Sequence, residues 1–205
     1  MRKKIVCIFL SMLLITVLFP RNATAGDEEN PEFEDRIFDV KLFGIFMFPM
    51  QFLFKYGDVV SAWVSEDSSN TDYLYISMKV RELRETTELE AIYDINWNYK
   101  NDRYITCVHS YPNGYGPFVI GKSIDGDYEY ETWISCEGIF DLENNIITWQ
   151  VPKNEVGSPN KGEFLTSFYP HTHLRFRDDS DLPHMDLFKD LYHNGKIEKD
   201  YQIQY

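Results

Sequence analysis

The stretch that decides the fold is VVSAWVSEDSSNTDYLYISMKV, residues 59–80. Apolar and polar residues alternate through 59–66 and again through 73–80. Because successive side chains of a strand point to opposite faces, this alternation predicts two strands that each bury one face. The residues between them, 67–72, are Asp, Ser, Asn and Thr, which are typical of turns. The sequence therefore predicts a β-hairpin here.

The same pattern recurs toward the C-terminus, where runs of alternating residues flank short turn-like clusters. Three further hairpins are expected, formed by 91–99 with 103–110, 118–124 with 127–136, and 139–142 with 146–151. Another strand is expected at 164–176, a helical turn at 187–192 and a final strand at 201–205. About ten short strands with little helix predict an all-β fold, an antiparallel β-sandwich with immunoglobulin- or jelly-roll-like layering.

The N-terminal residues have a different composition. Three basic residues, 2–4, precede fifteen uncharged residues, 5–19, and the small residues Ala23 and Ala25 follow. This order is typical of a signal peptide, so we expect residues 1–25 to be cleaved off. The apolar run is shorter than the ~20 residues of a membrane span, so no stable span is expected after cleavage. Residues 26–36 are predicted to be a flexible acidic leader, and 37–205 a single domain of a secreted or cell-surface protein.

Charge limits the partners. Four of the 20 Lys and Arg residues lie in 1–25, so the remainder has 16 basic and 33 acidic residues, a formal charge of −17. Such a chain repels nucleic acid and anionic lipid. Calcium is a cofactor candidate, because carboxylate loops bind it. The acidic loop residues Asp125, Asp127 and Glu129 are the candidate ligands, although Asp125-Gly126 equally fits a tight hairpin turn.

A second metal candidate is the pair His171 and His173, which a strand would place on one face. A metal site needs at least one further ligand, and no spacing rule brings another histidine close. The sequence contains no nucleophile elbow, phosphate-binding glycine loop or zinc-protease motif. We therefore expect no enzyme activity.

Cys107 and Cys136 remain after cleavage of the leader peptide. One alternative is a disulfide, which would close a loop of about thirty residues and stabilise the fold by roughly 3 kcal/mol. The other is two buried free thiols on separate strands. Spacing does not decide between them, because a bridge requires Cα atoms within about 7 Å.

Aromatic residues make up 16% of the chain, and exposed rings on a β surface are a common way to bind sugars. The three Trp residues inside apolar strands, 63, 97 and 149, are expected in the core. The candidate ligand-binding aromatics lie in or next to loops, and they are Tyr111, Tyr115, Tyr128, Tyr130 and Trp133. Residues 42–54, also rich in aromatics, are an alternative contact surface for a partner protein.

Several strands resemble those of extracellular β-sandwich modules, the DOMON-like or family 9 carbohydrate-binding-like domains. The matching segments lie between residues 57 and 176, and they are GDVVSAW (57–63), YLYISMKV (73–80), YDINW (93–97) and ITWQVPK (147–153) with Gly157 and Gly162-Glu163. The resemblance implies a non-catalytic module that binds sugar or, in some branches, haem. Haem-binding members use a Met/His pair, but no spacing selects Met78 and His109 for that role.

These observations predict a secreted, non-catalytic binding or accessory module whose ligand is a glycan. The alternative is a structural or protein-interaction role at the cell surface through the aromatic segment 42–54.

Overall fold

The computed structural model describes residues 26–35, 41–42, 45–46, 55–123, 132–175, 186–190 and 199–205. The strands of these residues form one sheet in which neighbours pair antiparallel, so the predicted all-β class is confirmed. No helix in these residues is long and apolar enough to cross a membrane. The elements are β1 (Phe33–Glu34), β2 (Lys41–Leu42), β3 (Ile45–Phe46), η2 (Lys55–Gly57), β4 (Val59–Asp67), β5 (Asn70–Val80), β6 (Glu90–Tyr99), β7 (Asp102–Tyr111), β8 (Gly114–Tyr115), β9 (Phe118–Ser123), β10 (Thr132–Asp141), β11 (Ile146–Pro152), η3 (Lys153–Val156), β12 (Phe164–Arg175), β13 (Asp186–Asp190) and β14 (Tyr201–Gln202).

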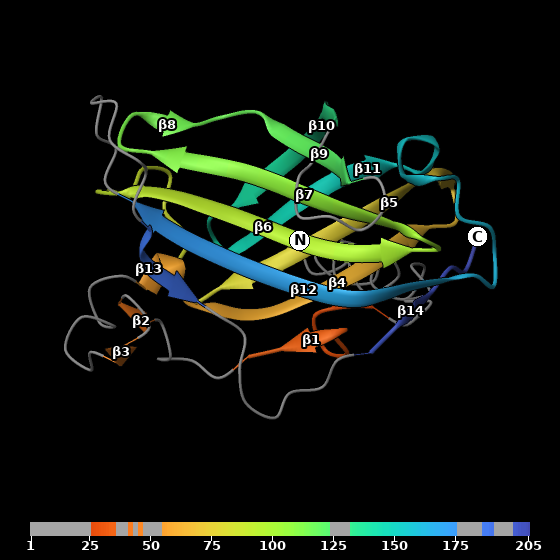
Figure 1. The fold of residues 1–205 in the computed structure, drawn as a ribbon, viewed down its shortest axis with the longest axis horizontal. Helices are drawn as coiled ribbons and strands as arrows, with labels where there is room; N and C mark the ends of the chain where they lie inside the picture. Colours follow the sequence, from red (N-terminus) through yellow and green to blue (C-terminus); the bar gives the residue numbers. More distant parts are fainter. Residues whose placement is uncertain are drawn as a thin grey trace, which may run out of the picture.

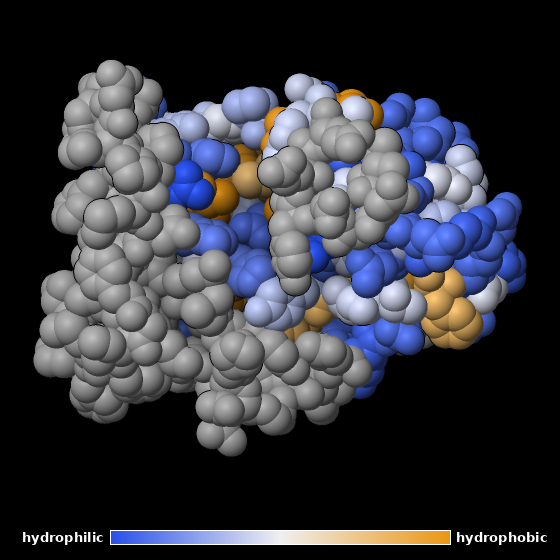
Figure 2. All heavy atoms as spheres, in the orientation of Figure 1, coloured by the Kyte–Doolittle hydropathy of each residue, from blue (hydrophilic) through white to orange (hydrophobic). Residues whose placement is uncertain are grey.

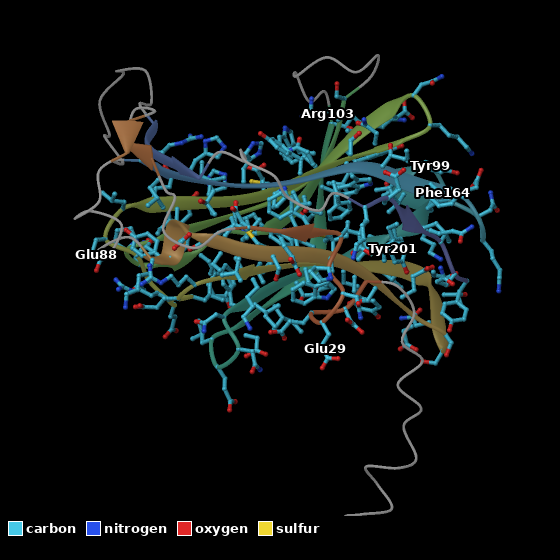
Figure 3. The ribbon with its side chains drawn as sticks, turned by 90° about the horizontal axis from the view of Figure 1, so that it is seen from below. Glu29, Glu88, Tyr99, Arg103, Phe164 and Tyr201 are labelled. Atoms are coloured by element: carbon cyan, nitrogen blue, oxygen red, sulfur yellow. The ribbon has the colours of Figure 1, made fainter. Side chains whose placement is uncertain are left out.

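The sheet curls so that its two halves face each other. Its strand order is β1-β4-β5-β11-β10-β9-β7-β6-β12-β13-β2-β3, with β8 beside β7 and β14 beside β12. In Figure 1, β6, β7 and β12 cross in front of β4, β5 and β11. Figure 3 shows the two layers from the side, with side chains between them. The layering is therefore made by one continuous sheet.

β10 joins the two layers. Its first half, Thr132–Cys136, pairs with β9, and its second half, from Glu137 to Asp141, pairs with β11. At this change of partner a Cβ on Gly138 would lie 2.1 Å from the ring of Phe118, so only glycine fits. The sequence predicted separate strands at 127–136 and 139–142, because the glycine-containing junction has the composition of a break. It is instead a crossing point within one strand.

The predicted hairpin of residues 59–80 is present as β4 and β5, with a tighter turn than expected. Asp67 pairs with Asn70, and only Ser68 and Ser69 lie between the strands. The carboxylate of Asp67 accepts hydrogen bonds from the backbone N–H and the hydroxyl of Ser69, at 2.8 and 2.7 Å. These local bonds hold the turn.

The core fills the space between the layers. Trp97 stacks with Tyr104 and Phe168 at centroid distances of 5.9 and 6.2 Å, and Phe118 packs edge-on against Trp149 at 5.9 Å. The three tryptophans expected in the core, residues 63, 97 and 149, are all buried.

The acidic N-terminal segment is part of the packed structure, contrary to the expectation that it stands apart as a leader. β1 pairs with β4, and Phe33 is only 1% exposed within the core. The carboxylate of Glu32 is buried and accepts a 2.8 Å hydrogen bond from the backbone N–H of Val64. Burial raises the pKa of Glu32 to about 7, and the Val64 N–H opposes the rise. The acidic composition of this segment predicted a flexible leader, although its apolar residue Phe33 packs in the core.

The C-terminal part adds two strands. The helical turn expected at 187–192 is wrong, because Asp186–Asp190 forms β13 between β12 and β2. The free edge of β12 offers hydrogen bonds that an isolated turn lacks. β2 and β3 pair antiparallel with each other. β14 pairs with the start of β12, so the alternating C-terminal residues dock on the sheet as expected.

Of the two alternatives for the cysteines, the structure has the free thiols. Cys107 pairs with Val119, and Val119 pairs with Ser135, so Cys107 and Ser135 share a face of the sheet. Cys136 is the next residue along β10 and therefore faces the opposite side. Burial raises the pKa of Cys136 to about 12, which keeps this thiol protonated.

Candidate functional site

β6 is buried on both faces, and the two faces differ in chemistry. Its odd-numbered residues, such as Tyr93 and Trp97, face the apolar core between the layers. Its even-numbered residues include Glu90, Asp94 and Asn96, which are also buried but lie on the outer face. Figure 2, in the orientation of Figure 1, shows mostly hydrophilic residues where this front face is coloured. We call the outer side of β10, β9, β7, β6 and β12 the polar face.

A bulge in β12 decides which of its residues reach the polar face. The register shifts between Thr166, opposite Asn98, and Tyr169, opposite Asn96, so one extra residue is inserted. Ser167 adopts a left-handed backbone with φ of 55° at this point. Before the bulge the odd residue Leu165 is in the core, and after it the even residues are. His171 and His173 are thereby placed on the polar face.

The two histidines meet Asp94 of β6. Asp94 Oδ1 lies 3.2 Å from His171 Nδ1, and Asp94 Oδ2 lies 3.5 Å from His173 Nε2. One ligand atom from each of the three side chains lies within 4.8 Å of the others. Asn96 donates a 2.9 Å hydrogen bond from Nδ2 to Asp94 Oδ1. This set, Asp94, His171 and His173, is named the Asp-His cluster.

A second carboxylate–imidazole pair lies on the neighbouring strands of the polar face. His109 Nδ1 is 2.8 Å from Glu90 Oε1, and the ring of Tyr111 is 5.9 Å from that of His109. Cys107 pairs with Asp94 across β7 and β6. Burial, and then the charge of Asp94, raise the pKa of the Cys107 thiol, so it is a neutral neighbour of the Asp-His cluster.

A small cleft adjoins the cluster. Its volume is about 190 Å³, and it is lined by Asn96, Trp97, Asn98, Arg103, Ser167 and Tyr169. Figure 3 shows Arg103 on the outer side of its layer. Tyr169 also packs edge-on against His171, with ring centroids 4.1 Å apart. The cleft and the Asp-His cluster therefore share walls.

Trp133 lies on the same face. It pairs with Gly121, which pairs with Ile105, which pairs with Asn96, so the four residues form one row across β10, β9, β7 and β6. The indole lies over Gly121, because a Cβ there would be 3.1 Å from the ring. Trp133 is 52% exposed. The absent side chain at position 121 leaves room for a flat ring that remains open to solvent.

Of the other predicted ligand-binding aromatics, the structure describes Tyr111 and Tyr115, and Tyr115 does not share the polar face with Trp133. Tyr115 pairs with the buried Ser110, and its ring is 4.6 Å from that of Phe140 at the end of the core. Tyr111 is half-exposed beside His109 on the polar face. The remaining predicted ligand residues lie outside the described part of the chain, and they are Tyr128, Tyr130, Asp125, Asp127 and Glu129. Most of segment 42–54 also lies outside it.

A larger, open hollow of about 600 Å³ lies elsewhere, between the start of β5, η3 and the C-terminal residues. Tyr73, Lys153 and Tyr205 are among the residues that line it. Lys153 is already engaged there, with Nζ 2.6 Å from Glu66 Oε1 and 2.7 Å from the backbone oxygen of Tyr205. These contacts hold the C-terminal residues in place.

Asp94, Asn96 and Arg103 were missed by the sequence reasoning. The signal for the first two was present, because Asp94 and Asn96 interrupt an apolar strand at alternate positions.

Comparison with protein-family models, curated proteins and solved structures gave no match. The polar face offers an exposed indole, amide and guanidinium donors around a cleft, and a carboxylate with two imidazoles.

Proposed function

We propose that this chain is an exported, non-catalytic binding module that holds a glycan on its polar face. The observation that carries the proposal is the placement of Trp133, a half-exposed indole in one row with the cleft residue Asn96. The C–H face of a pyranose stacks on such a ring.

The cleft supplies polar groups suited to sugar hydroxyls. Asn96 and Asn98 carry amides that both donate and accept hydrogen bonds, and Arg103 carries a planar set of donors. The strands of Trp133 and Arg103 are two steps apart, or about 10 Å, and Arg103 lies two residues from the row of Trp133. The two side chains could contact the two ends of a disaccharide. An aromatic platform beside convergent polar groups is the usual form of a small-ligand site.

The sequence supports the rest of the proposal. Residues 1–25 have the order of a signal peptide, and the strand segments between 57 and 176 resemble DOMON-like and family 9 carbohydrate-binding-like modules. Both features favour an extracellular or cell-surface location. The acidic remainder of the chain is suited to a partner that is neither nucleic acid nor anionic lipid.

Affinity electrophoresis of the purified protein through gels containing soluble polysaccharides tests the glycan claim. Retardation by at least one neutral polysaccharide is expected, and Trp133→Ala should weaken it by up to about tenfold, since aromatic stacking contributes roughly 0.5–1.5 kcal/mol. Tyr115→Ala, an exposed ring on the opposite side, is the matched control and should bind normally. Retardation that Tyr73→Ala abolishes and Trp133→Ala leaves unchanged would place the ligand in the larger hollow and contradict the proposal.

Export has its own test. Intact-mass analysis of the protein recovered from outside the cells of its source should give a chain that begins at Gly26. A product that still carries Met1 would contradict cleavage of the signal peptide.

A further inference from the structure

We propose that the Asp-His cluster is a binding site for a divalent transition-metal ion, with zinc as the reference ion. The inference is independent of the proposed glycan site, since it rests on the geometry of Asp94, His171 and His173 alone. Three protein ligands with one position left for water or another ligand is the arrangement of open zinc sites.

The separations fit a shared ion. Two ligand atoms that each lie about 2.1 Å from one tetrahedral ion are about 3.4 Å apart. Asp94 Oδ1 lies 3.2 Å from His171 Nδ1, and Asp94 Oδ2 lies 3.5 Å from His173 Nε2. All three ligand atoms lie within 4.8 Å of one another, so rotations of the carboxylate and the rings that bring them to about 3.4 Å would complete the coordination.

The backbone fixes the three ligands relative to one another. Asp94 and His171 are paired residues of neighbouring strands, and His173 is two residues along β12 on the same face. Strand positions of this kind hold ligands more firmly than loop positions do. The bulge at Ser167 selects the face, because regular one-to-one pairing of the same residues with β6 would point both imidazoles toward the core.

Supporting residues orient the ligands. Asn96 Nδ2 donates to Asp94 Oδ1 at 2.9 Å, and the ring of Tyr169 packs edge-on against His171 at 4.1 Å. Such outer contacts set ring orientation and raise metal affinity in characterised sites. The ligand side chains are 7–15% exposed, so the ion would be shielded from bulk water without being sealed off.

The donor set decides the class of ion. Imidazole nitrogen binds zinc, copper, nickel and ferrous iron, whereas calcium and magnesium prefer six or more oxygen donors. Two nitrogens and one carboxylate therefore favour a transition metal over calcium. The high negative charge of the chain beyond residue 25 also raises the local concentration of cations.

Position suggests what the ion would do. Asn96 and Tyr169 contact the cluster and also line the 190 Å³ cleft, so an ion held there would border the cleft. Its open coordination position would then be available to a small oxygen ligand, such as water or a hydroxyl group.

Isothermal titration of the purified, chelator-treated protein with zinc chloride tests the proposal. One tight site per chain is expected, and His171→Gln, His173→Gln and Asp94→Asn should each weaken it by at least a hundredfold. Asn96→Ala should weaken it by about tenfold, through lost orientation of Asp94. The matched control is His109→Gln, which removes a histidine paired with Glu90 on the adjacent strand and should leave zinc binding unchanged.

A spectroscopic measurement on the unmutated protein tests the proposal without relying on variants, which could lose zinc binding by failing to fold. Cobalt(II) bound at the cluster should give the intense visible absorption of a four-coordinate site, and zinc should displace it. Calcium at the same concentration should not. Absence of a tight zinc site in the unmutated protein, or equal weakening by His109→Gln and His173→Gln, would overturn the proposal.

Discussion

The two faces of β6 are both buried, but one carries apolar core residues and the other carries polar residues. Toward the core, Trp97 stacks with Tyr104 and Phe168, and these contacts stabilise the fold through apolar burial. Toward the outside, Asp94 is as buried as its neighbours but is held by His171 and Asn96. Burying a carboxylate costs free energy that hydrogen bonds only partly return. The cost on the outer face supports the proposal of a binding site there, whereas the inner face stabilises the fold.

Insertion of one alanine between Tyr169 and Pro170 should produce the largest effect, because it shifts the rest of β12 by one residue. The lengthened strand would have to turn Leu174 out of the core and the two histidines into it. We expect a loss on the order of 5 kcal/mol in the free energy of unfolding, from the exposure of an apolar side chain and the burial of polar ones. Urea unfolding followed by near-ultraviolet circular dichroism measures it.

Deletion of Ser167 is the control for that insertion. It removes the extra residue of the bulge, with its left-handed backbone, and leaves Leu165 and Phe168 in the core and the histidines outside, so stability should change by no more than about 1 kcal/mol. If the insertion is as mild as the deletion, the register of β12 does not set the faces.

Trp97→Ala should destabilise the fold by about 4 kcal/mol, since the site cannot collapse around so large a cavity. Asn96→Ala, on the opposite face of the same strand, removes one hydrogen bond to Asp94 and should cost only about 1 kcal/mol. Chemical denaturation of both variants gives the comparison directly. Equal losses would mean that the polar face is as structural as the core.

Glu32 is a second buried carboxylate, and it can be compared with Asp94. A backbone N–H donates to Glu32, whereas two imidazoles lie beside Asp94. The folded state raises the pKa of Glu32 from 4.5 to about 7, so the folded protein binds the proton more tightly than the unfolded chain. Stability should therefore fall as pH rises from about 4.5 to 7, by on the order of 3 kcal/mol.

Glu32→Gln should remove most of that pH dependence, as measured by urea unfolding at several pH values. The exposed Glu34, two residues further along, provides the control substitution Glu34→Gln, which should retain it. A Glu32→Gln profile that matches the unmutated protein would show that another group titrates.

The smallest expected effect concerns the thiols. Cys107 and Cys136 face opposite sides of the sheet, so addition of a reducing agent should leave the melting temperature unchanged. Alkylation of the denatured, unreduced protein should label both residues. Protection of the pair from alkylation would show that a bridge forms.

The hairpins could be predicted because each is a local pattern. Residues 91–99 alternate with a period of two, and that alternation alone identifies a strand with two different faces. The Asp-His cluster could not be completed from sequence, since Asp94 and His171 lie 77 positions apart and meet only through the pairing of β6 with β12. The residues around Ser167 contain no pattern that predicts the bulge, and this bulge places the histidines on the outer face.

Other differences have similar causes. Gly138 is of a residue type common in turns, but here it lies within a strand and leaves room for the ring of Phe118. That contact is set by packing between distant strands. Phe33 is one apolar residue among acidic ones, and only the pairing of β1 with β4 makes it part of the core. Local composition describes the average of a segment, whereas a single side chain can decide where the segment docks.

The most direct test of the division between the two faces is the long-range ¹H–¹⁵N spectrum of the histidine imidazoles, recorded with and without one equivalent of zinc. We predict that the signals of His171 and His173 shift together and that those of His109 stay in place. A spectrum in which zinc moves none of these signals, or moves His109 as much as the other two, would contradict the claim that the outer face of β6 is built to bind.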